Sequence, residues 1–364
     1  MRILISGGGT AGHINPALSI ADYAKEKANA KVLFVGTERG LEKTLVTHAG
    51  YDIKFVDVEG LKRSLTLENV KVLAKYLKAI KDSKKIIKEF KPDVVVGTGG
   101  YVCAPVVAAA SALGIPSIIH EQNVIPGVTV KMSLKKVSKA CISFNDTLNY
   151  IDKSLHDKCV LTGNPLDEKL LAGSYSEERA KLGLGDKPFI VMIGGSLGAD
   201  RLNNAMVDFV NTIDKDSVYF MSAAGKRYYD KVMEKIDKDK LTDTVKVLPY
   251  IYNREEIYPA ADLIISRAGA LSVSEICAIG KASILIPSPN VAHNHQEYNA
   301  KSIERGGGAK VILERDLTNE TFKKTVYEII NDKEKCNEMG KNARQMGICD
   351  ASKRIFDIIE ELCK

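Results

Sequence analysis

The chain has 364 residues, 45% of them hydrophobic and 27% charged, a balance typical of a globular protein that is too long for a single hydrophobic core. No apolar run approaches the roughly 20 residues that a membrane-spanning helix needs, and no signal peptide precedes the first apolar strand. The seven cysteines are scattered and contain no Cys-x-x-Cys pair. They therefore argue against a disulfide framework or a zinc site and predict a cytosolic protein.

Positive charge is concentrated in the first half of the chain. Residues 1–160 hold 23 basic and 15 acidic side chains, whereas residues 161–364 hold 29 and 31. This asymmetry indicates that the first half meets an anionic partner, such as nucleic acid, a phospholipid surface or a phosphorylated substrate. Nucleic acid is disfavoured because the basic region lacks interleaved stacking aromatics and the chain has no Trp.

The first predicted strand, residues 2–6, runs into a glycine turn at residues 7–12, and a helix is expected from about Pro16 to Lys27. The turn has the spacing G-x-G-x-x-G and should approach a phosphate or a sugar closely. The second strand, residues 31–36, ends without the acidic residue that an NAD site needs. His13 follows the turn near the helix N-terminus, where the dipole favours a neutral ring, so we expect either a proton acceptor or a helix cap.

Residues 60–91 are the most basic stretch of the chain. From Leu73 onward we expect an ordinary helix with a solvated lysine face. The preceding segment places Leu61 and Leu65 beside Lys62 and Arg63, a pattern that predicts contact with an anionic membrane surface.

Further strands also end in glycine or polar turns. A strand at residues 93–97 leads into Gly97 to Tyr101, and the strand at residues 117–120 ends in His120-Glu121-Gln122-Asn123. Polar groups at the carboxyl ends of parallel strands are where ligands meet open α/β sheets. After a short strand at residues 158–161, Thr162 to Pro165 break the pattern, and we place the domain junction there.

The same plan begins again in the second half. A strand at residues 189–193 precedes a glycine turn at residues 194–199, and a strand at residues 263–265 precedes residues 266–270 and a helix. Glu275 lies inside that helix, where its carboxylate can accept hydrogen bonds from a ribose diol. The polar residues 293–299 suit a ligand covered in hydroxyls. Two glycine turns in each half predict two doubly wound α/β domains, residues 1–162 and 163–347, facing one another across a ligand cleft.

Metal ligation is poorly supported by the sequence. The pairs Asp214/Asp216 and Asp237/Asp239 lie among lysines in charged stretches, and no His or Cys cluster is present. We therefore expect neither a metal nor another cofactor.

Seven motifs occur in order along the chain. They are Gly8-Gly9-Thr10-Ala11-Gly12-His13, Gly99-Gly100-Tyr101, His120-Glu121-Gln122-Asn123, Gly163-Asn164-Pro165, residues 194–199, residues 267–275 and His295-Gln296-Glu297. Together they resemble the MurG family of N-acetylglucosaminyltransferases over nearly the whole chain. The resemblance implies a two-domain GT-B fold of two Rossmann-like domains, with the last helix (about residues 348–364) packing back on the first domain.

The resemblance also implies an activity in peptidoglycan synthesis. The donor would be UDP-N-acetylglucosamine (UDP-GlcNAc). The acceptor would be undecaprenyl-pyrophosphoryl-MurNAc-pentapeptide (lipid I), converted to lipid II by inversion without a metal. The enzyme would be peripheral, at the cytoplasmic face of the cell membrane, beside other cell-wall synthesis proteins. Two alternatives remain open: a related GT-B transferase with another lipid acceptor, and a dinucleotide-binding module.

Site residues carry over by position. For the donor, the resemblance implies that Ile251 meets uracil, Glu275 the ribose, and Gln296 with Glu297 the sugar hydroxyls. The diphosphate would lie against Ser196, Ala270, Leu271, Ser272, Val273 and Ser274. On the other domain, the sugar would meet Thr10, Ala11, Gly12 and Asn123, and the acceptor Gly99, Gly100 and Tyr101. His13, or alternatively Glu121, would remove the proton from the acceptor's 4-hydroxyl.

Three positions depart from the family's pattern. Asp167 stands where an arginine is usual, Ser222 where a histidine is usual, and Asp200 where a basic residue is usual. These changes put in doubt the contacts that those residues make in the family, although Arg201 could offset Asp200.

Overall fold

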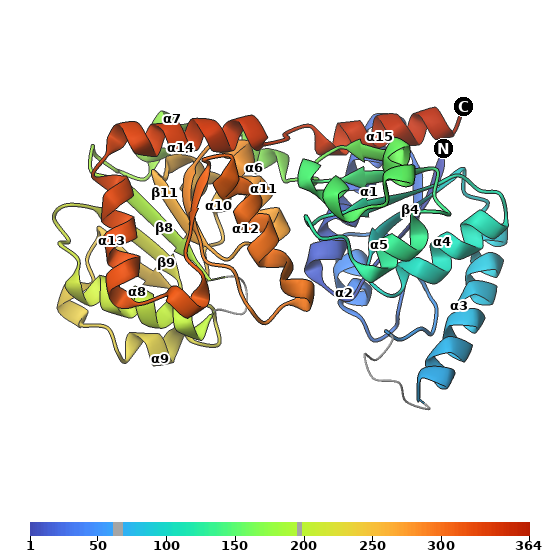
Figure 1. Ribbon diagram of the computed structural model, residues 1–364, viewed down its shortest axis with the longest axis horizontal. Helices are drawn as coiled ribbons and strands as arrows, with labels where there is room; N and C mark the ends of the chain where they lie inside the picture. The colour runs from blue at the N-terminus through green and yellow to red at the C-terminus, as the bar shows by residue number, and fades with distance from the viewer. Residues whose placement is uncertain (61–67, 195–198) are drawn as a thin grey trace. The chain divides into compact units, whose positions relative to one another are not determined.

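The computed structural model describes residues 1–60, 68–194 and 199–364 and divides into two compact units (Figure 1). Unit 1 comprises Met1–Leu166 together with Asp350–Lys364, and unit 2 comprises Asp167–Cys349. Within the described residues, no helix is both long enough and apolar enough to cross a membrane.

Unit 1 is built on a seven-stranded parallel sheet in the order β3-β2-β1-β4-β5-β6-β7. The strands are β1 (Arg2–Gly7), β2 (Lys31–Gly36), β3 (Asp52–Phe55), β4 (Val94–Gly99), β5 (Ser117–Glu121), β6 (Lys139–Ile142) and β7 (Cys159–Leu161). The direction of winding reverses between β1 and β4, which are neighbours with Ser6 paired to Gly97. In such sheets the carboxyl ends of the strands at the reversal are the usual ligand-binding edge.

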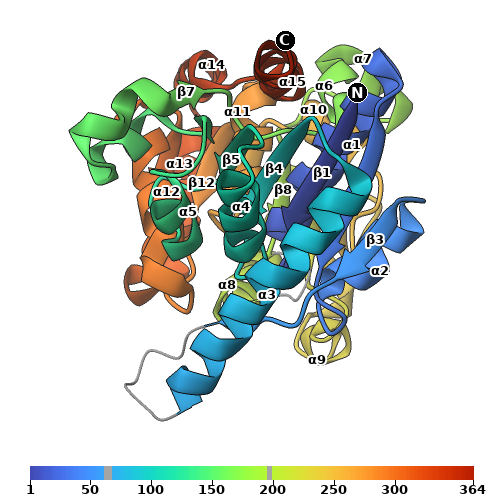
Figure 2. The same cartoon turned by 90° about the vertical axis from the view of Figure 1, so that its right-hand side faces the viewer.

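Helices cover both faces of this sheet. One face carries α1 (Ala11–Ala28), α2 (Leu41–His48) and α15 (Ala351–Leu362), and the other carries α3 (Glu68–Phe90), α4 (Cys103–Ala112) and α5 (Val128–Ser133) (Figure 2). Two short 3₁₀ helices, η1 (Asn145–Tyr150) and η2 (Lys153–Lys158), precede β7. The C-terminal α15 inserts Ile355 and Ile359 into the core formed by α1 and β1. Each such fully buried side chain stabilises the fold by about 1.5–3 kcal/mol.

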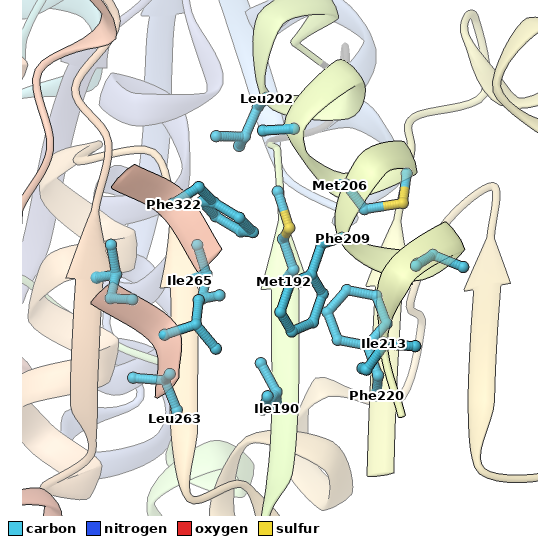
Figure 3. Close-up of a cluster of buried hydrophobic side chains, with 14 of the residues drawn as sticks. Ile190, Met192, Leu202, Met206, Phe209, Ile213, Phe220, Leu263, Ile265 and Phe322 are labelled. Carbon is cyan, nitrogen blue, oxygen red and sulfur yellow. The ribbon is translucent and has the colours of Figure 1, made fainter. Parts of the chain in front are cut away.

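Unit 2 has a six-stranded parallel sheet in the order β10-β9-β8-β11-β12-β13. Its strands are β8 (Phe189–Ile193), β9 (Tyr219–Ala223), β10 (Val245–Leu248), β11 (Leu263–Ser266), β12 (Ala282–Leu285) and β13 (Ala309–Val311). Its core contains Met192, Phe209, Phe220, Ile265 and Phe322, with the Phe209 and Phe220 rings 5.4 Å apart (Figure 3).

The helices of unit 2 lie before, between and after these strands. They are α6 (Glu168–Ala172), α7 (Tyr175–Lys181), α8 (Asp200–Thr212), α9 (Tyr229–Met233), α10 (Arg254–Ala260), α11 (Ala270–Ile279), α12 (His295–Arg305), α13 (Asn319–Ile330) and α14 (Lys333–Met346). The 3₁₀ helices are η3 (Lys238–Lys240), η4 (Ala292–Asn294) and η5 (Glu314–Asp316). The prediction of two doubly wound α/β units with Rossmann-like sheets is confirmed.

One predicted boundary is wrong. The helix expected from about Pro16 begins at Ala11, so His13 lies in its first turn rather than ahead of it. Pro16 lies inside α1, beyond the four terminal residues whose N–H groups have no helical partner, so it removes one backbone hydrogen bond from the helix.

Candidate functional site

The two glycine turns of unit 1 lie against each other, because β1 and β4 are neighbouring strands. The Gly8 N–H donates to the Gly99 carbonyl at 3.3 Å. Gly99 and Gly100 have φ values of +106° and +80°, and a Cβ on Gly100 would collide with the Gly8 carbonyl oxygen. Only glycine combines this backbone conformation with such a close approach.

His13 lies over this pair of turns. A Cβ on Gly99 would lie 2.7 Å from His13 Nδ1, so the missing side chain makes room for the imidazole. The Thr98 hydroxyl donates to the His13 carbonyl at 2.8 Å, which ties the first turn of α1 to β4. His13 Nδ1 is 2.9 Å from Gln122 Oε1.

The tautomer of His13 follows from the surroundings of Gln122. The buried Gln122 amide donates from Nε2 to the Thr98 carbonyl at 2.8 Å, and the same nitrogen is 2.9 Å from His120 Nδ1. The amide oxygen therefore faces His13 and accepts from its Nδ1–H. A neutral imidazole with its proton on Nδ1 carries its lone pair on Nε2, the form a general base needs.

His120 completes this chain of hydrogen bonds. Its Nε2–H donates to the Gly163 carbonyl at 3.0 Å. Burial lowers the pKa of His120 to about 4, since the hydrogen bond to Gly163 offsets only part of the desolvation. The ring is therefore neutral near pH 7, and its Nδ1 accepts from Gln122. Asn164 donates from Nδ2 to the Gln122 carbonyl at 3.1 Å, so the Gly163-Asn164 motif supports the same chain.

Glu121 is fully engaged by its own loop. Its Oε1 accepts from the Asn123 N–H at 2.9 Å and from Asn123 Nδ2 at 3.3 Å, and its Oε2 accepts from the Gly127 N–H at 2.7 Å. Burial raises the pKa of Glu121, and these bonds oppose the rise. The carboxylate thus shapes the loop that carries Asn123, and of the two expected bases His13 has the geometry that suits proton transfer.

The start of α1 is open to solvent. Thr10, Ala11 and Gly12 are exposed, and the first turn contains no acidic residue. The unpaired N–H groups and the helix dipole at such an end favour an anion or a sugar oxygen. The half-buried Tyr101 lies beside the same turn, since a Cβ on Gly9 would be 3.6 Å from its ring.

Glu42, on α2, shapes the first glycine turn and is not predicted from the sequence. Its buried carboxylate accepts from the Gly9 N–H at 3.0 Å and from the Thr37 N–H and hydroxyl at 2.8 and 2.7 Å. Burial alone would raise the pKa of Glu42, but these hydrogen bonds lower it below its usual value. No local pattern marks this residue, because its partner in the turn lies 33 positions away.

In unit 2, the expected diphosphate residues Ala270, Leu271, Ser272, Val273 and Ser274 form the first turns of α11. Gly269 is the N-cap, and no acidic residue lies in the first turn. This helix start therefore has the chemistry of an anion site. Ser196, expected at the same phosphates, lies outside the described residues.

Glu275 is buried in α11, and its partner, Arg254, is not predicted from the sequence. Arg254 Nη1 donates to both carboxylate oxygens of Glu275, at 3.0 and 2.8 Å. Burial raises the pKa of Glu275, and the guanidinium opposes that rise. Ile251, expected to meet uracil through its backbone, has a buried side chain in the loop between β10 and α10.

The expected sugar-binding residues lie in the first turn of α12. Gln296 Oε1 accepts from the Ser288 N–H at 2.8 Å, which directs its amide nitrogen away from that loop. Glu297 pairs with Lys301 at 3.0 Å and accepts from Asn294 Nδ2 at 2.5 Å. Both side chains are partly exposed.

The three departures from the family pattern have defined surroundings. Asp167 caps α6 by accepting from the Lys169 N–H at 3.0 Å. Ser222 is buried in β9. Asp200 begins α8 and lies 4.0 Å from Lys231, while Arg201 donates to the Glu314 carbonyl at 2.9 Å.

Two further expectations concern membrane contact and metal binding. Leu61, Lys62, Arg63 and Leu65, the predicted membrane contacts, are not among the described residues. Across the described ranges, no three His, Cys, Asp or Glu side chains are grouped so that they could hold a metal ion.

Two family models match the chain in succession. Residues 3–142 match the glycosyltransferase family 28 N-terminal domain, and residues 189–355 match the glycosyltransferase family 28 C-terminal domain.

Full-length relatives share one name, UDP-N-acetylglucosamine–N-acetylmuramyl-(pentapeptide) pyrophosphoryl-undecaprenol N-acetylglucosamine transferase. Those from Thermoanaerobacter sp. (strain X514) and Acetivibrio thermocellus are each 43% identical to this chain. The alignments cover 100% of this chain and 100% and 99% of the relatives.

Solved structures extend the comparison. A crystal structure of MurG from Acinetobacter baumannii has a TM-score of 0.81 and 28% identity, covering 99% of both chains. The complex of S. aureus MnaA with UDP has a TM-score of 0.68 at 16% identity, covering 99% of this chain and 96% of the other. The second likeness is one of fold alone.

Proposed function

The chain belongs to glycosyltransferase family 28, and from that premise we infer that it transfers N-acetylglucosamine from UDP-GlcNAc to the MurNAc 4-hydroxyl of lipid I. The resemblance to the MurG family seen in the motifs is confirmed over the full length of the chain. The enzyme is thus a hexosyltransferase of peptidoglycan synthesis, which forms lipid II. The observation that carries the mechanism is the tautomer of His13 imposed by Gln122.

We assign donor recognition to unit 2. Glu275 accepts the ribose hydroxyls, and the loop at Ile251 offers its backbone to uracil. The N–H groups at the start of α11, from Ala270 onward, face the diphosphate, where negative charge develops as UDP departs. Gln296 and Glu297 bind the sugar hydroxyls. This assignment is supported by the start of α11, which has no side-chain cap and no acidic residue in its first turn, and by the buried carboxylate of Glu275 in its second turn.

We assign acceptor activation to unit 1. His13 Nε2 takes the proton from the acceptor's 4-hydroxyl. At the same time the oxygen of that hydroxyl attacks the anomeric carbon of the donor GlcNAc from the face opposite UDP. The new C–O bond forms as the bond to the diphosphate oxygen breaks, so the configuration inverts. The resulting imidazolium keeps its Nδ1–H bond to Gln122 and is stabilised by it. Glycines 99 and 100, Tyr101 and the start of α1 form the surface offered to the acceptor.

The decisive experiment is transfer of labelled GlcNAc from UDP-GlcNAc to a lipid I analogue, with diacylglycerol as the control acceptor. His13→Gln should lower kcat by about 10²–10⁴-fold, the usual contribution of a general base, with UDP affinity unchanged. Glu275→Gln should instead weaken UDP binding by about 1–3 kcal/mol, because a charge-assisted pair with the ribose is lost. Transfer to diacylglycerol in place of lipid I would contradict the proposed acceptor, and unchanged UDP affinity in Glu275→Gln would contradict the ribose assignment.

We also propose that unit 1 docks on the anionic cytoplasmic face of the membrane, where a polyprenyl-linked acceptor resides. The proposed docking face is formed by α3 and α5, which flank α4. The sequence predicts an ordinary solvated helix from Leu73 onward, but Leu73 and Leu77 on α3 are 55% and 60% exposed, and Val128 and Met132 on α5 are 56% and 46% exposed. Exposed lysines lie on both helices, at Lys71, Lys78, Lys81, Lys85, Lys88 and Lys131. Apolar side chains beside cations favour shallow insertion among anionic headgroups.

Vesicle binding tests the docking face. Leu73→Ser with Leu77→Ser should reduce binding to phosphatidylglycerol vesicles and transfer to membrane-embedded lipid I. Transfer to a short-chain soluble acceptor should be spared. Leu41→Ser on α2, which is 54% exposed in wild type, is the matched control. Equal losses with soluble and embedded acceptors would contradict docking through this face.

A further inference from the structure

Arg254 carries its positive charge at the N-terminus of α10, the end of the helix dipole that is unfavourable for a cation. Arg254 is the first residue of α10, where the partial positive charge of a helix N-terminus disfavours a guanidinium. Its compensation comes from α11, because Arg254 Nη1 donates to both oxygens of Glu275 at 3.0 and 2.8 Å. The Glu275 side chain is 9% exposed and that of Arg254 is 38% exposed, so the pair lies at the edge of the interior with the carboxylate inside.

The other groups near this pair do little to keep Glu275 ionised. Among the described residues, the charges acting on Glu275 are Arg254 and Asp167, the N-cap of α6, and Asp167 raises the pKa of Glu275 further. The phenols of Tyr258 and Tyr250, from α10 and the loop before it, face Arg254. Burial is the largest influence on Glu275 and raises its pKa, which leaves Arg254 as the group that favours the carboxylate.

A ribose diol requires the ionised form of Glu275. A carboxylate accepts hydrogen bonds at both oxygens, whereas a protonated acid presents one oxygen as a donor. Arg254 reaches both oxygens through the single atom Nη1, and each oxygen has a second lone pair that a hydroxyl can use. The ion pair is thus compatible with simultaneous binding of two hydroxyls.

We propose that Arg254 is a positioning residue for the nucleotide donor, which holds the Glu275 carboxylate ionised and oriented toward the ribose hydroxyls. The proposal rests on the proposed function through the contact between Glu275 and the ribose. Arg254 then affects the affinity for the nucleotide only through these ribose hydroxyls. A bond that merely joined α10 to α11 would affect stability without regard to the ligand.

Calorimetric titration with UDP and with 2′,3′-dideoxy-UDP separates these roles. Arg254→Met should weaken UDP binding roughly tenfold at about pH 8, and further as the pH falls to about 5.5 and Glu275 takes up a proton. Wild type should vary less than Arg254→Met over this interval. Arg254→Lys restores a positive charge at the same place and should recover most of the affinity. Lys324→Met removes an exposed cation that lies 3.9 Å from Glu328 in α13 and should leave UDP binding unchanged.

The dideoxy analogue decides the interpretation. It should bind wild type more weakly than UDP does, and Arg254→Met should not weaken it further. If wild type binds the two ligands equally, the ribose assignment of Glu275 fails, and with it the proposed donor site. If wild type discriminates between them and Arg254→Met discriminates equally at each pH, the role of Arg254 is refuted while the donor site stands. Tighter UDP binding by Arg254→Met would also refute it, since Arg254 would then compete with the ribose.

Discussion

Gly99→Ala provides a direct test of the geometry around His13. Gly99 has a φ of +106° and lies under the imidazole, where a Cβ would be 2.7 Å from His13 Nδ1. Gly114 also has a positive φ, +70°, but a Cβ there would meet nothing within 4 Å. Gly114→Ala therefore introduces backbone strain without a collision, and it is the matched control for Gly99→Ala.

The structure sets the size of the expected effect. In either variant, a left-handed conformation costs a non-glycine residue about 1–2 kcal/mol of stability. Only in Gly99→Ala must the ring also move by about 0.7 Å, to reach the 3.4 Å at which ordinary contact begins. Such a shift lengthens the 2.9 Å bond between His13 and Gln122 to as much as about 3.6 Å, a distance at which it is no longer a hydrogen bond. A displaced base of this kind lowers kcat by up to about 10²-fold.

The assay is single-turnover transfer of GlcNAc to a soluble lipid I analogue, combined with calorimetry of UDP and thermal unfolding. Gly99→Ala should lose kcat and keep its UDP affinity, because the nucleotide is assigned to unit 2. Gly114→Ala should lose stability to a similar extent and keep kcat. A kcat for Gly99→Ala within about threefold of the control would refute the assignment of His13 as the base, since a displaced base costs far more.

Glu42→Gln should destabilise unit 1 by about 2–3 kcal/mol in denaturant unfolding, because three hydrogen bonds lose their charged acceptor; a loss below about 0.5 kcal/mol would contradict this. Gln122→Met should lower kcat by about 10–100-fold without changing UDP affinity, since the His13 tautomer is no longer imposed, and an unchanged kcat would contradict the relay. The pKa of His120, about 4, lies below its unfolded value of 6.5, so the unfolded chain binds the proton more tightly. As the pH is lowered from 6.5 to about 4, the free energy of unfolding should therefore fall by up to about 1.4 kcal/mol per pH unit. His120→Asn should reduce that slope. Activity should survive excess EDTA, because the described residues contain no cluster of metal ligands; inactivation reversed by Mg²⁺ would argue otherwise.

Local sequence was sufficient for the elements that carry the chemistry. Buried strands ending in glycine turns are recognisable because alternation, turn residues and helix starts are encoded within about ten neighbouring residues. The turn at Gly99 and, to within one residue, the start of α11 at Ala270 are predictable in this way. The start of α1 is predicted too late, at Pro16, because proline is typical of a first helical turn and Gly12 has a low helix propensity. The helix begins at Ala11, and the Thr98 hydroxyl ties its first turn to β4.

The sequence by itself determined which residue types stand at the strand tips, and thereby the chemical class of the ligands. Only the tertiary structure decided which groups each of those residues contacts. Gln122 meets His13 across 109 positions, Glu42 meets Gly9 across 33, and Arg254 meets Glu275 across 21. The tautomer of a histidine or the charge of a buried carboxylate depends on the few groups within hydrogen-bonding distance, and which groups those are is set by strand order and helix packing rather than by nearness in the chain.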